Sequence, residues 1–144
     1  MQWKTGYSLR NKNFDFSFAG RISLGNYVYN NMFSTHGVYS DLYNSVGYLN
    51  NVTRNLLHTR FENPKYFSDY YIEDGSFMRL DHMTLGYNLE SPVNGVKNLR
   101  LYTTVQNVFL ITRYRGLDPE VANGIDNNVY PRPRNFLFGV SVQF

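Results

Sequence analysis

The last nine residues of the chain, residues 136–144 with the sequence FLFGVSVQF, place the strongest constraint on its fold. Side chains alternate between the two faces of a β-strand, so this segment predicts a strand with one apolar face and one mostly small or polar face. A water-soluble protein rarely leaves such an apolar strand at an edge, because it invites aggregation. A strand that faces lipid on one side and a polar lumen on the other explains the pattern better. The apolar face consists of Phe136, Phe138, Val140, Val142 and Phe144.

The composition fits β-structure and excludes several other classes. The chain has 13 Tyr and 11 Phe but is only 42% hydrophobic, which suits strands that carry aromatic side chains. No apolar run approaches the roughly 20 residues that a transmembrane helix needs. The absence of cysteine excludes a disulfide scaffold and thiolate zinc sites. Lys and Arg are scattered and give a net charge of only +3, so no nucleic-acid footprint is indicated.

Alternation with a period of two residues predicts about five strands. We expect them near residues 2–10, 14–29, 76–89, 98–109 and 135–144. In the third strand the apolar positions change phase between Leu80 and Met83. One additional residue near Asp81 and His82 would return all of them to the same face, so we expect a β-bulge there.

Short and long connections alternate between these strands. The turns at residues 11–13 and 91–97 are short, whereas the connections at residues 30–75 and 110–134 are long. A transmembrane β-barrel has short periplasmic turns and long extracellular loops. The sequence therefore predicts an all-β fold, an antiparallel up-and-down meander whose long connections leave from the same end. A short helix is expected near residues 49–57, within the first long connection.

Motifs in the second half of the chain resemble those of one family. GSFMRL at residues 75–80 and TLGY at 84–87 match one of its strands, and LRLY at 99–102, followed by QN at 106–107 and Thr112, matches the next. GLDPEV at 116–121, YP at 130–131 and the terminal Phe144 complete the order. Together these motifs resemble the C-terminal end of the SusC-like (RagA-type) TonB-dependent outer-membrane transporters of Bacteroidota. The likeness is dense over residues 73–144 and weaker over residues 1–72.

The resemblance implies a transmembrane barrel of about 22 strands with an N-terminal plug. It further implies uptake of oligosaccharides or peptides, a SusD-like surface lipoprotein that acts as a lid, and energy from the TonB complex through the plug. Residues 1–144 would be a C-terminal fragment of the barrel domain in outer-membrane lipid, with the plug absent. Because the smallest barrels need about 8 strands, we expect this fragment not to transport anything alone. The final strand, with the five apolar residues named above, would carry the signal for assembly into the membrane.

Two groups of residues are candidates for functional roles. Tyrosines and an arginine of the long connections suit contact with a sugar or a partner surface, because an aromatic ring offers contact area at a low entropic cost. Alternatively, these rings pack the loops. The group consists of Tyr39, Tyr43, Tyr48, Tyr70, Tyr71, Arg113, Tyr114 and Tyr130. A second group is expected to face the lumen. Its charges either pair with acidic residues, on neighbouring strands or on the plug, or they contact the substrate. This group consists of Lys4, Arg21, Arg79, Arg100, Tyr102 and Gln106.

No residue pattern points to an enzyme or to a bound cofactor. His36, His58 and His82 are far apart in the sequence and lack the spacing of metal ligands. Asp118 and Glu120 fit a structured loop better than a glycosidase pair or a calcium site. We therefore expect no catalytic, cofactor-binding or metal-binding residues.

The strand pattern by itself also permits two other interpretations. One is a soluble β-sandwich carbohydrate-binding module with tyrosine-rich loops, and the other is an extracellular adhesin or interaction fragment. Neither explains why short and long connections alternate so regularly, nor why the final strand has an outward apolar face.

Overall fold

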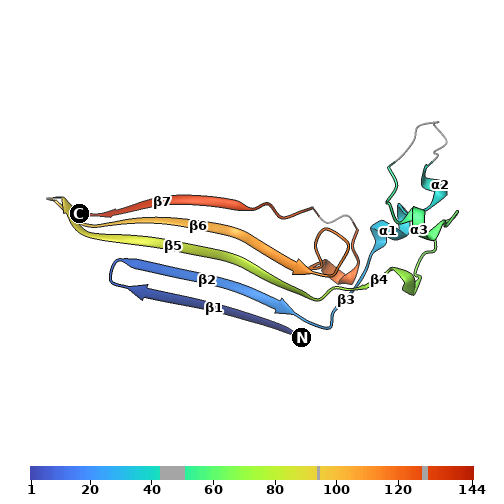
Figure 1. The fold of residues 1–144 in the computed structure, drawn as a ribbon, viewed down its shortest axis with the longest axis horizontal. Coiled ribbons are helices and arrows are strands. Elements are labelled where there is room, and N and C mark those ends of the chain that lie inside the picture. Colours follow the sequence, from blue (N-terminus) through green and yellow to red (C-terminus); the bar gives the residue numbers. More distant parts are fainter. Residues whose placement is uncertain (43–50, 94, 128–129) are drawn as a thin grey trace. The chain divides into compact units, whose positions relative to one another are not determined.

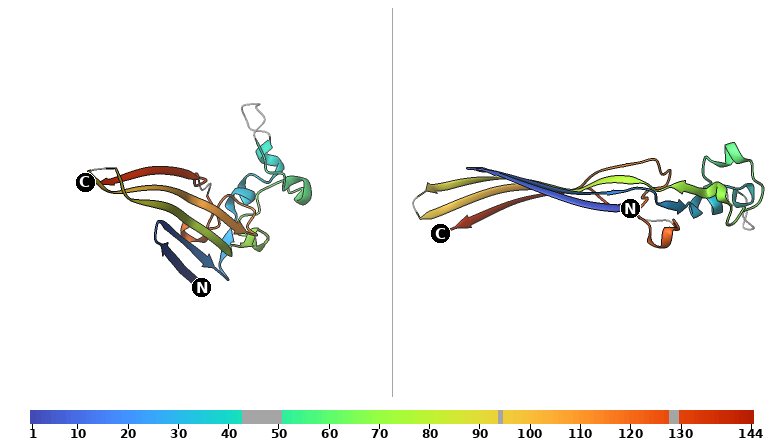
Figure 2. Two further views of the ribbon diagram at one scale, coloured as in Figure 1. Left: turned by 60° about the vertical axis from the view of Figure 1, so that its left-hand side comes forward. Right: turned by 90° about the horizontal axis from the view of Figure 1, so that it is seen from below.

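The computed structural model describes residues 1–42, 51–93, 95–127 and 130–144. One antiparallel sheet of five strands, in the order β1-β2-β5-β6-β7, dominates the fold, with its strands side by side (Figure 1, Figure 2). The strands are β1 (Gln2–Asn11), β2 (Phe14–Ser23), β5 (Phe77–Val93), β6 (Val96–Thr112) and β7 (Asn135–Gln143). The predicted up-and-down antiparallel meander is confirmed.

The chain divides into two compact units, which we call the sheet unit and the loop unit. The sheet unit comprises residues 1–24, 77–112 and 132–144, and the loop unit comprises residues 25–76 and 113–131. The two segments of the loop unit are thus the two long connections. Its elements are β3 (Tyr27–Tyr29), α1 (Asn31–Thr35), α2 (Tyr39–Leu42), α3 (Leu56–Thr59), β4 (Ile72–Asp74) and the 3-10 turns η1 (Asp69–Tyr71) and η2 (Ala122–Gly124). No helix among the described residues is long and apolar enough to cross a membrane.

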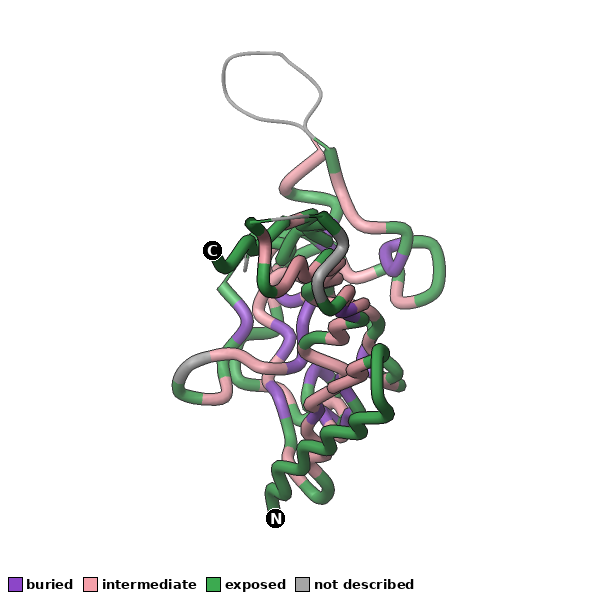
Figure 3. The backbone as a smooth tube through the Cα atoms, turned by 90° about the vertical axis from the view of Figure 1, so that its left-hand side faces the viewer, coloured by how far each residue is buried: buried purple, intermediate pink, exposed green. Residues whose placement is uncertain are grey.

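The strand register gives the sheet unit an apolar face and a polar face. One apolar row crosses all the strands of the sheet through Tyr7, Phe18, Met83, Val105 and Phe136. Intervening residues point to the other face, because side chains alternate along a strand. The apolar face is uncovered, and Phe138 on it is 82% exposed. β1 is exposed along its whole length (Figure 3). A contiguous apolar surface of this kind marks a face that meets lipid or another apolar partner.

The predicted β-bulge in β5 is confirmed. Gly20 of β2 pairs with Leu80, whereas the adjacent Ala19 pairs with His82, so Asp81 is an additional residue. Without it, the apolar residues that follow in β5 would point to the polar face, because a shift of one residue exchanges the two faces of a strand.

The neighbouring strand β6 contains a larger irregularity opposite this bulge. Phe109 and Gln106 pair with residues on either side of Asp81, so Asn107 and Val108 both lie opposite this one residue. Asn107 has a φ of 52°, in the left-handed region that asparagine tolerates better than most residues. Its side-chain amide donates a hydrogen bond of 2.7 Å to the Arg132 carbonyl, which fixes the entry to β7.

The expected strand at residues 14–29 is wrong in its second half. β2 ends at Ser23, and Gly25 turns the chain with a φ of 71°. Glycine adopts such a conformation without the penalty that a side chain brings, and it breaks the extended backbone. Tyr27–Tyr29 then forms β3, which pairs with β4 in a separate two-stranded sheet.

Other boundaries also differ from those expected. β5 and β6 have 17 residues each, so they are longer than the expected strands at 76–89 and 98–109, and also longer than the roughly 9–11 residues that cross a bilayer. The helix expected near residues 49–57 corresponds in part to α3 at Leu56–Thr59, while residues 49 and 50 lie outside the described part of the chain.

The loop unit has its own core, built from both long connections. β3 pairs with β4 on one side, and on its other side Tyr29 forms a parallel bridge with Ile125 of the second connection. Val28, Val38 and Tyr71 are almost completely buried. Rings of Tyr29, Tyr70 and Tyr71 meet edge to face, with centroids 5.2 to 6.2 Å apart, in a geometry that aromatic pairs favour. The two connections therefore fold as one body.

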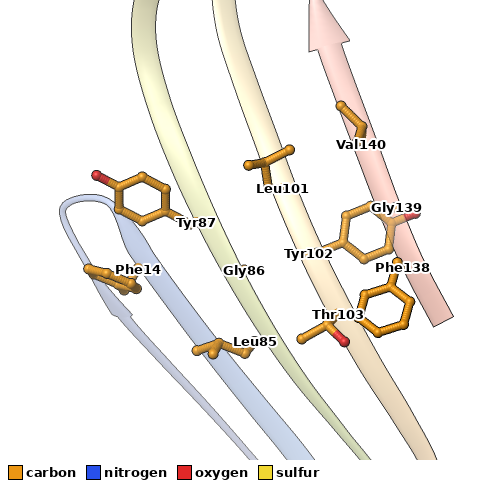
Figure 4. A pocket seen from close by; sticks show the side chains of 10 residues that line it. All are labelled: Phe14, Leu85, Gly86, Tyr87, Leu101, Tyr102, Thr103, Phe138, Gly139 and Val140. Atoms are coloured by element: carbon orange, nitrogen blue, oxygen red, sulfur yellow. The ribbon is translucent and has the colours of Figure 1, made fainter. Parts of the chain in front are cut away.

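Large side chains on the polar face of the sheet lie over glycines of neighbouring strands. Tyr102 of β6 pairs with Gly139 of β7, and a Cβ atom at Gly139 would lie 2.2 Å from the Cζ atom of the ring (Figure 4). In the same row, the Asp15 carboxylate occupies the space above Gly86, where an added Cβ would lie 2.4 Å from its Oδ1 atom. The lack of a side chain at these two positions lets the row pack closely.

We expect Gly139→Val to destabilise the sheet by about 1–3 kcal/mol, because the new side chain would displace the Tyr102 ring. Ser141→Val is the matched control, since Ser141 lies on the same face of β7 and is exposed. Urea unfolding of the protein in detergent would measure both effects. Equal unfolding midpoints for the two variants would contradict the role of Gly139.

Candidate functional site

The polar face of the sheet contains all of the residues that were expected to face a lumen. They are Lys4, Arg21, Arg79, Arg100, Tyr102 and Gln106, and the strand register places them on one side of the sheet. The register establishes that they share a face, while the orientation of this face toward a lumen stays a prediction.

One charged cluster spans three strands near the short turns. Arg100 of β6 reaches across β5 to Asp15 of β2, with its Nε atom donating to Oδ1 at 3.1 Å and an Nη atom donating to Oδ2. Asn88 of β5 donates to the same Oδ1 atom at 3.0 Å. The small Gly86 between them makes the crossing possible. Arg100 thus pairs with an acidic residue of the sheet, as the structural role weighed for these arginines requires, but its partner lies two strands away and not on a neighbouring strand.

A second cluster lies at the β-bulge. Arg21 is directly opposite Arg79 in the register, an arrangement that destabilises a sheet when both residues carry the same charge. The bulge residue Asp81 compensates, because the Arg21 guanidinium donates to both of its carboxylate oxygens at 2.8 and 2.9 Å. Arg79 is only 2% exposed, and its guanidinium carbon lies 5.7 Å from the centre of the Phe77 ring.

Next to this cluster the polar face forms a hollow of about 590 Å³, which we call the polar hollow. Its polar lining comes mainly from Arg79, Asp81, His82, Gln106, Asn107 and Arg132. Two of these residues, Arg79 and Gln106, were expected to face the lumen. No sequence pattern selected Arg132, because it lies within a connection. Its proximity follows from the start of β7 at Asn135, which is paired with Gln106.

The apolar face has a hollow of its own, which is shallow and lies between β5, β6 and β7. Its volume is about 520 Å³, and Figure 4 shows its side chains. The residues that line it include Phe14, Leu85, Tyr87, Leu101, Phe138 and Val140. The Phe14 and Tyr87 rings lie 4.7 Å apart. Such a surface offers dispersion contacts and almost no polar group, so it suits acyl chains rather than a specific polar ligand.

The candidate residues of the long connections divide into exposed and buried sets. Tyr39, Tyr70, Arg113 and Tyr130 are exposed on the loop unit. Tyr43 and Tyr48 lie outside the described residues. Tyr71 and Tyr114 are buried, which fits the alternative that these rings pack the loops. Their rings lie in the core of the loop unit, together with Val28 and Val38.

Polar contacts join the two connections inside the loop unit. Arg115 donates to the Glu73 carboxylate through an Nη atom at 2.9 Å and through its backbone N–H at 3.0 Å. Asn30 donates to the same carboxylate at 3.0 Å. The Glu73 carboxylate raises the pKa of Arg115 by accepting the hydrogen bond from its guanidinium. Sequence reasoning missed Glu73, since its only signal was its position before a turn.

The Tyr114 hydroxyl donates a hydrogen bond of 2.6 Å to the Asp126 carboxylate, and both residues are buried. Burial raises the pKa of the Tyr114 phenol, and the hydrogen bond to Asp126 raises it further. Among the described residues, no group of three or more acidic or histidine side chains could hold a metal ion.

No family model matches the chain. It is 44% identical over 140 residues to the TonB-dependent receptor SusC of Bacteroides thetaiotaomicron, which covers 92% of this chain and 14% of that protein. It is 31% identical over 156 residues to the TonB-dependent receptor P3 of Formosa agariphila, which covers 94% of this chain and 15% of that protein. The chain thus spans about a seventh of the length of these curated relatives.

The fold is similar to part of two solved structures. One is the RagAB peptide importer in the closed-closed state, with a TM-score of 0.70, 21% identity, and coverage of 98% of this chain and 17% of that one. The other is the same importer in the open-open state, with a TM-score of 0.69, 20% identity, and coverage of 99% and 17%. At 20–21% identity, this likeness shows a shared fold alone.

The two-faced meander and these relatives define a segment of a TonB-dependent receptor, a class of outer-membrane proteins. Within this class, the chain belongs to the SusC-like receptors, as its motifs indicated. The soluble β-sandwich is not favoured, because the sheet has no second layer over its apolar face among the described residues.

Arginine substitutions at two adjacent positions of β7 test which face meets lipid. Phe138→Arg should lower the amount of folded receptor in the outer membrane, because a cation on the lipid side costs about 2–4 kcal/mol near the midplane. Leu137→Arg is the matched control on the polar face and should have a smaller effect. Heat-modifiable mobility in gels would measure the folded fraction. A larger loss for Leu137→Arg would reverse the assignment of the faces.

The buried Tyr114 predicts a dependence on alkaline pH. The pKa of Tyr114 in the folded state lies above the unfolded value of 10.0, so the unfolded state loses its proton first as the pH rises. The resulting stability is therefore fully present below pH 10.0 and is lost as the pH rises through the folded-state pKa. Tyr114→Phe should reduce this dependence without abolishing it, because burial also raises the pKa of the Tyr71 phenol. It should cost about 1–3 kcal/mol at neutral pH, since Asp126 loses a buried partner.

Urea-dependent proteolysis within residues 113–131, at several pH values, would measure the stability of the loop unit. Tyr130→Phe is the control, because Tyr130 is 86% exposed. The same alkaline loss in Tyr114→Phe as in the unmodified receptor would contradict the assignment.

Proposed function

We propose that the chain forms part of the barrel wall, together with two extracellular loops, of an outer-membrane importer of oligosaccharides or peptides. One observation carries the proposal: the sheet has an apolar face and a polar face, and both long connections leave from one end of it. A transmembrane barrel needs both properties, because its outer face meets lipid and its inner face meets water. The similarity to SusC and to the fold of the RagAB peptide importer supports the same function.

The sheet needs further strands and a lipid environment. Within the described chain, β1 pairs only with β2 and β7 pairs only with β6, so each has one open edge. In a bilayer, backbone groups at an open edge cost several kcal/mol each unless they are paired. We therefore assign the open edges to the rest of a large barrel of about 22 strands, whose lumen holds the plug. The chain is then the C-terminal segment of this barrel.

The final strand has a second role in the proposal. Phe136, Phe138, Val140 and Val142 are exposed on one face of β7, and Phe144 follows them. At the open edge of β7 the unpaired backbone N–H and C=O groups are also a template for another strand. It suits the signal that directs assembly into the outer membrane.

Partners outside the membrane complete the mechanism. A SusD-like surface lipoprotein would close over the extracellular loops, and the TonB complex would act through the plug. The exposed Tyr39, Tyr70, Arg113 and Tyr130 are the residues of this chain that would meet the lid or the nutrient. Aromatic rings and arginine are the side chains that dominate binding at such surfaces. We assign the chain no catalytic, cofactor-binding or metal-binding role.

Import by the intact receptor tests the proposal. Cells that lack the receptor gene should fail to grow on the oligosaccharide or peptide that it imports, but should grow normally on the corresponding monosaccharide or amino acids. Expression of the intact receptor should restore growth. A monodisperse monomer that unfolds cooperatively in plain buffer, without detergent, would instead support the soluble module and refute a membrane importer.

In the same cells, combined Tyr70→Ala and Tyr130→Ala substitutions should reduce uptake several-fold, because each removes a ring that is exposed for contact. Receptor abundance in the outer membrane should not change. Tyr27→Ala is the control, since Tyr27 is an exposed tyrosine of the loop unit outside the candidate group. Unchanged uptake in the double variant would remove both residues from the recognition surface.

A further inference from the structure

We propose that the hollow on the apolar face of the sheet unit, which we call the apolar hollow, binds one anionic glycerophospholipid. An acyl chain of this lipid lies in the hollow, and its phosphate lies beside Lys97. The proposal rests on one part of the proposed function, namely that the apolar face meets lipid. It goes beyond general contact with a bilayer, because it assigns a defined position and a headgroup charge to one lipid molecule.

The apolar hollow exists because one small residue stands among large ones. Thr103 of β6 is paired with Leu85 of β5 on one side and with Phe138 of β7 on the other. In the adjacent row of the same face, Tyr87 is paired with Phe14. Large side chains therefore surround the short side chain of Thr103, as Figure 4 shows. The volume of about 520 Å³ lies within the roughly 300–1,000 Å³ that is usual for small-molecule sites.

The lining of the apolar hollow fits a hydrocarbon chain. It consists mainly of aromatic and aliphatic side chains, whose dispersion contacts with such a chain are individually weak and collectively large. Phe14, Leu85 and Phe138 are exposed, so their surfaces are accessible to a lipid. A hollow contacts a chain on several sides at once, whereas a flat surface contacts it on one. An acyl chain is therefore held more strongly here than on a flat part of the sheet.

A cation lies on the same face, at the end of the sheet that carries the short turns. Lys97 precedes Leu101 by four residues along β6, so alternation places both side chains on the apolar face. The two residues are about 13 Å apart along the strand, from a rise of about 3.3 Å per residue. Half of the hydrocarbon core of a bilayer measures roughly 15 Å. A phosphate beside Lys97 and a chain beside Leu101 therefore fit within one lipid molecule.

The electrostatic surroundings of Lys97 favour an anionic headgroup. Two described acidic residues of the sheet unit lie near this end, Asp15 and Glu90, and the register places both on the polar face. Asp15 is also bound to Arg100. Lys12, in the turn between β1 and β2, adds a second cation at the same end. Basic residues near a bilayer surface attract anionic lipids. Short turns lie on the periplasmic side of a barrel, so the site opens to the leaflet that consists of glycerophospholipids.

Tyr87 supplies a hydroxyl group between the hollow and the headgroup region. Its ring lines the hollow beside Phe14, with the two ring centroids 4.7 Å apart. Its oxygen lies on the side of the ring toward the turn between β1 and β2 (Figure 4). Tyrosine is enriched where hydrocarbon meets headgroups, because its ring is apolar and its hydroxyl is polar. The apolar hollow, Tyr87 and Lys97 thus follow the order of tail, polar boundary and phosphate in a phospholipid.

Photolabelling locates the lipid on the intact receptor. The purified receptor in non-ionic detergent is mixed with phosphatidylglycerol that carries a diazirine in one acyl chain, irradiated, and analysed by peptide mass spectrometry. We expect saturable labelling of residues 99–105 and 136–142. Unlabelled phosphatidylglycerol should compete better than phosphatidylethanolamine with the same chains, because only the former has a net negative charge. Unlabelled lipid A, which has phosphates but more chains and a bulkier headgroup, should also compete less well.

Two variants with matched controls test the two ends of the site. Thr103→Phe should abolish labelling of these segments, because the new ring occupies the hollow. Thr5→Phe makes the same change on the apolar face of β1, outside the hollow, and should leave labelling unchanged. Lys97→Gln should weaken competition by phosphatidylglycerol about 5-fold, which corresponds to about 1 kcal/mol for one cation at a bilayer surface. Arg10→Gln removes a cation near the same end on the polar face, and competition should not change.

Heat-modifiable mobility in gels first shows that each variant is a folded barrel. If Thr103→Phe does not fold, Lys97→Gln keeps the test decisive, because Lys97 is exposed near the end of its strand.

The outcomes separate the site from the proposed function. Loss of labelling in Thr103→Phe and weaker competition in Lys97→Gln support the site. Even labelling of the hollow and of the apolar face of β1, no labelling at residues 136–142, or no effect of either variant overturns it. Equal competition by phosphatidylethanolamine or by lipid A overturns it as well. In each of these cases the importer function stands. Failure of import in the growth assay would instead count against the proposed function.

Discussion

Strand register is the constraint on which the rest of the structure depends. Along each strand, neighbouring side chains point to opposite faces, so a slip of one residue would exchange lipid-facing and polar positions. Cross-strand pairing keeps Tyr7, Phe18 and Met83 in one apolar row across three strands. It also keeps the arginines of the polar face beside their acidic partners. The separation of an apolar face from a polar face requires that this register be maintained.

Two local devices maintain the register and the close packing of the polar face. The inserted Asp81 returns the second half of β5 to the correct phase, and its carboxylate also neutralises Arg21, which would otherwise face Arg79 without compensation. A single insertion thus serves both geometry and electrostatics. The glycines at 86 and 139 act in another way, by leaving room for the Asp15 carboxylate and the Tyr102 ring above them. A large side chain on one strand is accommodated by a glycine on the next.

The sequence was sufficient to predict features that depend on local pattern, but not those that depend on tertiary contacts. Alternation predicted the meander, and a change of phase predicted the bulge at Asp81. The end of β2 was missed because residues 27–29 have the composition of a strand, while Gly25 takes a left-handed conformation that the pattern does not reveal. The sequence left open whether Tyr71 and Tyr114 pack the loops or contact a ligand, because their burial arises between two connections that lie far apart in the sequence. Arg132 joined the candidate site only through the pairing of β6 with β7.

The irregularities of β5 and β6 are best understood as one feature. A regular sheet would present its polar side chains in even rows, without a hollow between them. Additional residues at Asp81 and at Asn107 and Val108 interrupt the rows at the same level of the sheet. The interruption disrupts local ladder hydrogen bonds, and the hydrogen bond from Asn107 to the chain before β7 restores part of this loss. Because the same bond holds the segment that carries Arg132, the irregularity that keeps the apolar face continuous also shapes the polar hollow.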